Sequence, residues 1–321
     1  MKIIFIPLSA LILIIASCSR KTVPSRVEKL KAEKQAALNN KISKSEPAKD
    51  NTNNNDSGNA IVRDSTKYVD VDYANKVYNK LAQSFADTIA MNPNFNDPSL
   101  DYTKDFVGSV NVNMRKPNYV IIHHTSQGSV DETLHTFTLE RAAVSAHYVI
   151  GRDGSIHHMV NDYLRAWQAG IGKWGSVTDM NSCSVGIELD NDGYGPFTEK
   201  QINSLLKVLA SLKKRFGIPQ ANFIGHADFA PTRKNDPNVN FPWQTLSQKG
   251  FGLWWSDTTN VQVPPDFNET QALRIIGYDI RDVGRAVIAF RRHFCAIESA
   301  QPALSPAERK VLYCLYTKYM Y

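Results

Sequence analysis

The chain has 321 residues, which is enough for one sizeable domain and a second, smaller one. Its formal net charge of +6 at pH 7 would suit a nucleic-acid ligand if the excess covered a folded surface. Residues 1–67, however, hold 12 of the 37 basic and 6 of the 31 acidic side chains, so the remainder carries 25 of each. This balance argues against a nucleic-acid partner for the folded part, and it leaves the basic excess in an N-terminal tail.

Residues 1–18 have the pattern of an export signal that ends in a cysteine. An apolar run over residues 3–15 follows a positive start and is too short to span a bilayer permanently. Ala16 and Ser17 lie directly before Cys18, a pattern that resembles the bacterial lipobox, in which the cysteine is acylated. An ordinary signal peptide with an incidental cysteine is the alternative. We expect lipidation at Cys18, which would hold the protein on a membrane surface.

Residues 19–65 are predicted to form a disordered polar tether. They are rich in Lys, Asn, Ser, Asp and Glu and contain no aromatic side chain. Such a composition cannot bury enough apolar surface to offset the entropy that is lost on ordering. Ser19 follows the candidate lipid-bearing cysteine and, by analogy with enteric bacteria, favours the outer membrane. We therefore expect a lipid-anchored protein of the bacterial cell envelope that faces the periplasm.

Residues 66–115 are predicted to form a helical N-terminal extension. Its clearest element is a helix over residues 68–90, in which apolar side chains recur at helical spacing, namely Tyr73, Val77, Leu81 and Phe85. We expect this extension to pack against the main domain.

Residues 116–258 are predicted to form the main domain. Apolar runs bounded by turn residues predict strands over residues 119–124, 147–150, 155–160, 184–190 and 222–226. Helices are predicted over residues 131–141 and 199–216. Thr198 caps the second helix, and Gln201 completes a capping box. Strands that alternate with helices favour an α/β fold, with a mixed central β-sheet flanked by helices.

A proline-rich linker at residues 263–265 precedes a C-terminal segment, residues 266–321, that is predicted as a small three-helix domain. Its helices are predicted over residues 270–276, 281–294 and 305–320. Cys295 and Cys314 could pair across two of these helices, or each could remain a buried free thiol. The sequence leaves both alternatives open.

Three side chains could hold a divalent metal ion. His226 and Asp236 lie on one short connection that prolines make stiff, and His123 lies near the end of the first predicted strand. Two imidazoles and one carboxylate give three protein ligands and leave a position for water, as in catalytic zinc sites. Lys234 could lie near the same metal. Glu188 lies in a buried apolar strand, where a carboxylate is costly unless it has a partner or a catalytic role.

Six ordered segments within residues 118–243 form a pattern that is specific when they are taken together. They are residues 120–125, 144–150, 152–154, 165–170, 184–189 and 225–237. The pattern resembles the zinc-dependent N-acetylmuramoyl-L-alanine amidases of type 2, in the branch of AmpD and AmiD, which share a fold with the peptidoglycan recognition proteins. The resemblance implies this fold for the main domain. It also implies Zn²⁺ as a cofactor, with His123, His226 and Asp236 as its ligands.

The resemblance assigns further roles to residues of this chain. Glu188 matches the general acid/base, and Lys234 matches the lysine that stabilises the transition state. Gln168 stands where the family pattern has histidine, at a position that lines the substrate groove. Trp167 beside it is either a core aromatic or a wall of that groove, and we expect the wall.

Two further histidines are expected near the site. His124 alternates with His123 along the predicted strand, so its side chain points to the other face of the sheet. Because the strand ends there, we still expect His124 to contact substrate. His147 is expected to support the site by hydrogen bonding without binding the metal. Surface or structural positions are expected for the remaining histidines without motif support, His135, His157, His158 and His293.

The resemblance implies hydrolysis of the amide bond between N-acetylmuramic acid and L-alanine, in peptidoglycan or in muropeptides, by a monomer that serves wall turnover, recycling or remodelling. A non-catalytic peptidoglycan-binding receptor is the alternative, because members of this fold that lose zinc ligands bind without cutting. The presence of Asp236, Glu188 and Lys234 favours the enzyme. A zinc protease is disfavoured, since the sequence contains no His-Glu-x-x-His. The C-terminal segment resembles a three-helix peptidoglycan-binding domain, with a purely structural cap as the alternative.

Overall fold

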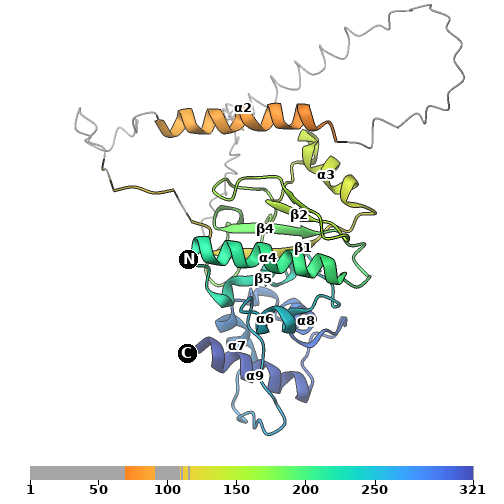
Figure 1. Cartoon of the computed structure of the whole chain (residues 1–321). Coiled ribbons are helices and arrows are strands. Elements are labelled where there is room, and N and C mark those ends of the chain that lie inside the picture. The colour runs from red at the N-terminus through yellow and green to blue at the C-terminus, as the bar shows by residue number, and fades with distance from the viewer. Residues whose placement is uncertain (1–68, 91–108, 110, 115, 321) are drawn as a thin grey trace, which may run out of the picture. The chain divides into compact units, whose positions relative to one another are not determined.

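The computed structural model describes residues 69–90, 109, 111–114 and 116–320 (Figure 1). The predicted export signal, the lipidation site at Cys18 and the polar tether lie outside these residues. Within the described part of the chain, no helix combines the length and the apolar character that are needed to cross a bilayer.

A mixed five-stranded sheet lies at the centre of the fold, in the order β3-β2-β4-β1-β5 (Figure 1). Its strands are β1 (Tyr119–His124), β2 (Tyr148–Ile150), β3 (Ile156–His158), β4 (Ser184–Leu189) and β5 (Phe223–Gly225). β1 runs parallel to β4 and β5, β2 runs parallel to β4, and β3 is antiparallel to β2. The predicted α/β fold is confirmed, and every predicted strand is present with its ends shifted by two residues at most.

Helix α4 (Glu199–Phe216) packs on one face of the sheet. As predicted, the hydroxyl of Thr198 caps it by accepting a hydrogen bond of 3.1 Å from the Gln201 backbone N–H. The Gln201 side chain does not return to the cap. It donates instead to the carbonyl oxygens of Ile150 and Asp190, so the reciprocal half of the predicted capping box is wrong.

Side-chain alternation along the strands divides the sheet between two apolar clusters. On β1, Val120 and Ile122 belong to a first cluster together with α4, whereas Ile121 belongs to a second cluster on the opposite face. His123 therefore shares the face of Ile121. His124 points to the face of Val120 and Ile122, as the sequence predicted.

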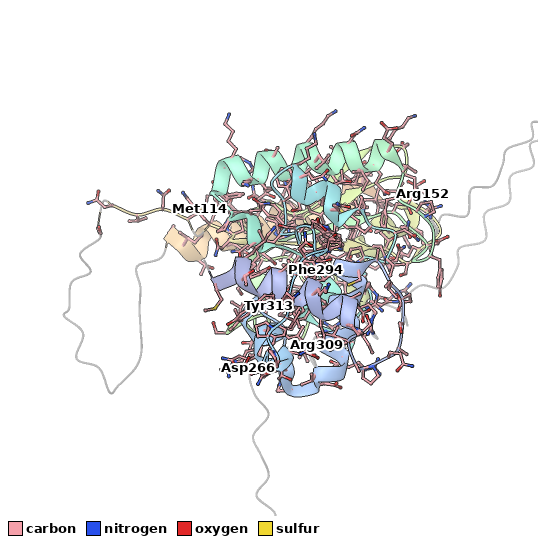
Figure 2. The ribbon with its side chains drawn as sticks, turned by 90° about the horizontal axis from the view of Figure 1, so that it is seen from below. Met114, Arg152, Asp266, Phe294, Arg309 and Tyr313 are labelled. Atoms are coloured by element: carbon pink, nitrogen blue, oxygen red, sulfur yellow. The ribbon has the colours of Figure 1, made fainter. Side chains whose placement is uncertain are left out.

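The C-terminal helices fill the second face. They are α7 (Glu269–Ile276), α8 (Val283–Cys295) and α9 (Pro306–Met320), which confirm the three predicted helices. Phe294 of α8, labelled in Figure 2, lies in the second cluster together with residues of the sheet and of all three helices, among them Ile121, Ile224, Leu273, Phe290 and Leu312. The segment thus shares its apolar core with the sheet. Its boundary at residue 266 and its peptidoglycan-binding character stay predictions.

Helix α2 (Val71–Ala90) confirms the predicted N-terminal helix, but it contributes no buried residue. Its apolar stripe is 39 to 59 % exposed at Tyr73, Val77, Leu81 and Phe85. The Tyr78 hydroxyl accepts a hydrogen bond of 3.0 Å from the Asn161 backbone N–H. Packing of the apolar stripe against the main domain stays a prediction.

Short helices complete the elements around the site. Helix α3 (Val130–Thr138) ends earlier than predicted, because Leu139 adopts an extended conformation and a 3₁₀ turn follows. Helix α5 (His226–Phe229) begins directly after β5, where the sequence predicted the end of a strand. Helix α6 (Trp243–Gln248) follows the connection that contains Asp236.

The described cysteines, Cys183, Cys295 and Cys314, are free thiols. Of the two alternatives for Cys295 and Cys314, the structure shows the thiol form. Burial raises the pKa of Cys295 to about 12, so this thiol stays protonated at neutral pH and is a poor nucleophile.

Candidate active site

The carboxyl ends of β1 and β5 bring two histidines together. The two strands are parallel neighbours in register, so His123 near the end of β1 and His226 just after β5 lie side by side. Their rings meet edge to face with centroids 4.4 Å apart. Asp236 lies beside the two histidines, because its carbonyl oxygen accepts a hydrogen bond of 2.8 Å from the N–H of Ala227, the residue after His226.

Three ligand atoms converge on one buried point. Asp236 Oδ2 lies 3.0 Å from Nδ1 of His123 and 3.0 Å from Nδ1 of His226. Nε2 of His226 lies 2.8 Å from the carbonyl oxygen of Ala169, which can only accept, so Nε2 carries the proton and Nδ1 presents a lone pair. Without a cation, the ring would need a second proton to face the carboxylate. The three side chains, at most 6 % exposed, therefore fit a zinc ion.

The carboxylate of Asp236 is ionised and firmly held. Burial alone would raise its pKa, but His226 and His123 hold the pKa well below the ordinary value. Two residues further on, the Asn238 N–H donates a hydrogen bond of 3.1 Å to His124 Nδ1. The connection is thus held at Asp236 itself and two residues after it.

Glu188 of β4 lies beside this point. It pairs in register with His123, and its Oε1 lies 3.9 Å from His123 Nδ1. Its Oε2 is buried without a hydrogen-bond partner in the described part of the chain. Burial raises the pKa of Glu188 to about 7, against the lowering influence of His123. A carboxyl group with this pKa can accept a proton and return it near neutral pH.

Lys234 is half-buried on the connection between His226 and Asp236. Burial has the largest effect on both neighbouring pKa values, since it raises that of Glu188 and lowers that of His124. The positive charge of Lys234 lowers both pKa values. Its ammonium has no hydrogen-bond or ion-pair partner among the described side chains. It is therefore available to a group that develops negative charge at the site.

Comparison with known proteins decides the family. Residues 113–239 match the family model of N-acetylmuramoyl-L-alanine amidases. The chain is 33 % identical over 207 residues to the N-acetylmuramoyl-L-alanine amidase AmiD of Escherichia coli, a match that covers 54 % of this chain and 74 % of AmiD. The chain belongs to the type 2 N-acetylmuramoyl-L-alanine amidases.

Two further relatives extend this likeness. The 1,6-anhydro-N-acetylmuramyl-L-alanine amidase AmpD of Enterobacter cloacae is 33 % identical over 145 residues, which cover 40 % of this chain and 78 % of AmpD. The solved complex of E. coli AmiD with the substrate anhydro-N-acetylmuramic acid-L-Ala-D-gamma-Glu-L-Lys superposes with a TM-score of 0.58 and 27 % identity. That match covers 66 % of this chain and 93 % of AmiD.

The predicted groove residues of this amidase have different surroundings. Trp167 is 55 % exposed, which excludes the core alternative and agrees with a groove wall. Gln168 is half-buried, and its side chain turns inward to His123 and Ser184. His124 is 5 % exposed and holds Asn238. Substrate contacts by these three residues stay predictions.

His147 directly precedes β2, bonds Gly186 of β4 through its backbone N–H, and contributes no atom to the cluster of ligand atoms. It is fully buried, its Nδ1 accepts from the Gly186 N–H at 3.0 Å, and its Nε2 lies 3.1 Å from the Leu164 carbonyl oxygen. Burial lowers its pKa, so the ring is neutral with the proton on Nε2. This arrangement suits the supporting role predicted for His147.

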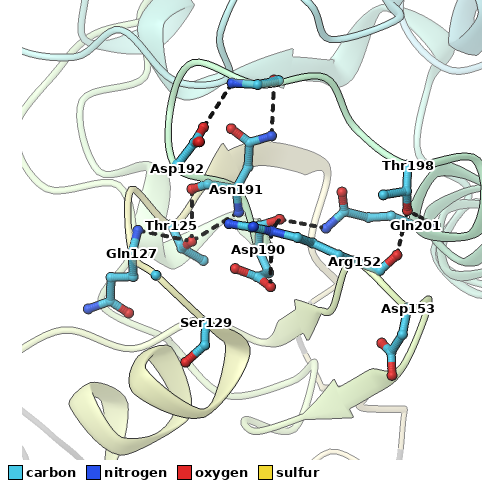
Figure 3. A network of polar contacts seen from close by, with 12 residues as sticks. Thr125, Gln127, Ser129, Arg152, Asp153, Asp190, Asn191, Asp192, Thr198 and Gln201 are labelled. Atoms are coloured by element: carbon cyan, nitrogen blue, oxygen red, sulfur yellow. Dashed lines mark hydrogen bonds and ion pairs between the residues drawn. The ribbon is translucent and has the colours of Figure 1, made fainter.

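A network of polar contacts holds the segments that follow β1 and β4 in the amidase (Figure 3). The Thr125 hydroxyl exchanges two hydrogen bonds of 3.2 Å with the backbone of Asn191. Arg152 Nε lies 3.4 Å from Asp190 Oδ2 in an ion pair. The network keeps the strand ends that carry His123 and Glu188 at a fixed spacing.

Sequence reasoning missed two supports of His226. Arg233 Nη2 donates to the Ala169 carbonyl oxygen at 2.7 Å, the same atom that His226 Nε2 contacts. His293, for which the sequence predicts only a surface or structural position, is 6 % exposed and lies against Asp228, two residues after His226. Because Arg233 directly precedes Lys234, its position in the sequence could have indicated a role at the site. Nothing local in the sequence connects His293 to residue 228.

Proposed function

We propose that this chain is a zinc-dependent amidase that cleaves the bond between N-acetylmuramic acid and L-alanine in peptidoglycan or in soluble muropeptides. The convergence of two Nδ1 atoms and one carboxylate oxygen beside Glu188 carries this proposal. Two relatives support the substrate class, since AmpD is named for its anhydro-muramyl substrate and AmiD is solved with an anhydro-muramyl peptide. The activity would serve wall turnover, recycling or remodelling.

His123, His226 and Asp236 would hold the zinc ion. When bound, zinc would lower the pKa of a water molecule and polarise the scissile carbonyl group. Glu188 would take a proton from the attacking water through its free Oε2 and pass it to the nitrogen of the leaving L-alanine. The oxygen of water ends in the new lactyl carboxyl group, the C–N bond breaks, and the stem peptide leaves with a free amine.

Lys234 would stabilise the negative oxygen that forms when water adds to the carbonyl group. Its ammonium is half-buried and is not engaged with another described side chain, so little of its charge is cancelled. Trp167 would form one wall of the groove, because an exposed indole offers a large flat surface to a sugar or peptide. His124 and Gln168 would border the same groove from the sheet side.

Mass spectrometry of purified muropeptides tests the reaction. The full chain in detergent should release free stem peptide and intact sugar in the presence of zinc, and a chelator should abolish this release. Glu188→Gln should lower kcat by ~10²–10⁴ while zinc content is unchanged. Tight binding of muropeptides without cleavage at any metal concentration would instead support the peptidoglycan-binding receptor.

We also propose that the protein acts as a monomer at the cell envelope, attached by a lipid on Cys18 to the outer membrane and facing the periplasm. The support comes from the sequence pattern of residues 15–18 and from Ser19. Metabolic labelling with a fatty acid should mark the original protein and leave Cys18→Ala unlabelled. Equal labelling of both proteins would rule out Cys18 as the attachment site.

A further inference from the structure

The side chain of Gln168 joins His123 to strand β4 through consecutive hydrogen bonds. Its Oε1 lies 2.7 Å from His123 Nε2, and its amide nitrogen donates to Ser184 Oγ at 2.7 Å. Ser184 Oγ in turn donates to the Met180 carbonyl oxygen at 2.6 Å. His123, Ser184 and Met180 are each at most 3 % exposed, so water does not compete for these contacts.

The carbonyl oxygen at the end sets the direction of every bond in this series. A carbonyl oxygen only accepts, so the single proton of the Ser184 hydroxyl goes to Met180. The hydroxyl oxygen must then accept a hydrogen bond from the amide NH₂ group of Gln168. This leaves the amide oxygen facing His123, and Nε2 of that ring must donate to it. Nδ1 of His123 consequently carries the lone pair that faces Asp236.

The reversed amide would have the opposite effect. Its NH₂ group would meet His123 Nε2, which would then have to be the unprotonated nitrogen, and the ring proton would move to Nδ1. A protonated Nδ1 cannot bind a metal ion. The Ser184 hydroxyl would also have to serve two acceptors with one proton. The observed orientation is therefore the one that prepares Nδ1 as a ligand.

The protein leaves room for this side chain and holds it in place. A Cβ atom on Gly186 would come within 2.4 Å of Gln168 Cγ, so only glycine at this point of β4 lets the side chain lie across the strand. The Asn181 side-chain oxygen accepts hydrogen bonds of 3.0 and 2.8 Å from the backbone N–H groups of Gln168 and Ala169. Both the main chain and the amide of Gln168 are thus fixed before any ligand arrives.

We propose that Gln168 is a positioning residue that keeps the proton of His123 on Nε2 and thereby prepares Nδ1 to bind zinc. The inference rests on the proposed function in naming zinc as the metal. This role is additional to the groove contact that the sequence predicts for Gln168. An amide does not titrate near neutral pH, so it presents the same acceptor to His123 across the working range.

Zinc affinity, measured by competition with a chromophoric chelator, tests the inference without reference to hydrolysis. Gln168→Leu removes the acceptor at similar volume and should weaken zinc binding by ~10–100-fold. Gln168→Glu keeps an acceptor for His123 but loses the hydrogen bond donated to Ser184, so it should bind zinc more tightly than Gln168→Leu. Ser184→Ala frees the amide to rotate and should lie between the two. Gln220→Leu, the same change at a half-buried glutamine that donates to Ser247 and Gly252, should leave zinc affinity unchanged.

Two outcomes would overturn the inference. One is a Gln168→Leu variant that binds zinc as tightly as the original protein. The other is a Gln168→Glu variant as weak as Gln168→Leu, since an acceptor alone would then not suffice. A purely structural role would lower the melting temperature of the metal-free variants and leave their zinc affinity unchanged. Failure of the original protein to bind zinc would instead count against the proposed function.

Discussion

His293 Nδ1 lies 2.6 Å from Asp228 Oδ2, and this contact joins helix α8 to the helix that begins with His226. The same carboxylate accepts a hydrogen bond of 2.6 Å from the Tyr278 hydroxyl and one of 2.7 Å from the Gly225 N–H. Through Asp228, the C-terminal helices hold the segment that carries a predicted zinc ligand.

Replacement of His293 should show how much this contact contributes. His293→Phe keeps a ring that can stack on Trp243, whose centroid lies 3.9 Å away, but removes the partner of a buried carboxylate. We expect the free energy of unfolding to fall by about 2–3 kcal/mol, measured by urea denaturation. Tyr278→Phe, which removes one hydroxyl from the same carboxylate, should act in the same direction. Unchanged stability in both variants would contradict the account.

The raised pKa of Glu188 predicts a pH effect on the metal-free protein. Burial raises this pKa from 4.5 to about 7, so the folded state holds the proton more tightly than the unfolded chain does. The free energy of unfolding should therefore fall as pH rises from 4.5 to 7, by roughly 3 kcal/mol from this group. Denaturation series with Glu188→Gln should lack this fall. An identical pH dependence in the two proteins would refute it.

Lys234 is predicted to act on the rate of the reaction and not on the fold. Lys234→Ala should lower kcat by ~10²–10³, because it removes the charge that faces the developing oxyanion. Zinc content and melting temperature should be unchanged. Lys214→Ala, an exposed lysine of α4, provides the matched control and should retain the original rate. Full turnover by Lys234→Ala would remove this residue from the mechanism.

Zinc should stabilise the protein by mass action. At free zinc 100-fold above Kd the gain is about 2.7 kcal/mol, so the melting temperature should rise with zinc concentration and fall on chelation. His226→Ala should lose this dependence, since it removes one of the three convergent atoms. His157→Ala changes a histidine outside the cluster and should respond as the original protein does. A zinc-dependent melting temperature in His226→Ala would argue against the ligand assignment.

The shared core predicts one cooperative transition for the sheet and the C-terminal helices. Phe290 of α8 is fully buried in the cluster that also contains Ile121 of β1. Phe290→Ala should cost about 3–5 kcal/mol and lower the stability of the whole unit. Circular dichroism and tryptophan fluorescence, to which Trp174 of the same cluster contributes, should report a single midpoint. Two separate transitions would show that the helices fold independently.

Local patterns in the sequence were sufficient for much of the fold and for the three convergent ligands. The apolar run of β1 has the predicted bounds, and Thr198 caps α4, because both depend on neighbouring residues. The inward turn of Gln168 depends instead on the space above Gly186 and on the hydroxyl of Ser184. The contact of His293 with Asp228 joins residues that are 65 positions apart in the sequence. Such long-range contacts are set by packing and leave no local pattern.

The second apolar cluster also determines when the site can form during folding. Ile121 of the first strand and Leu315 of the last helix belong to that cluster, so its completion requires almost the whole chain. A chain folded only as far as α8 exposes the apolar face of α7 and lacks part of the packing behind α5, where His226 lies. Contacts so distant in sequence form slowly. The packing behind His226 is therefore complete only once the helix Pro306–Met320 has docked.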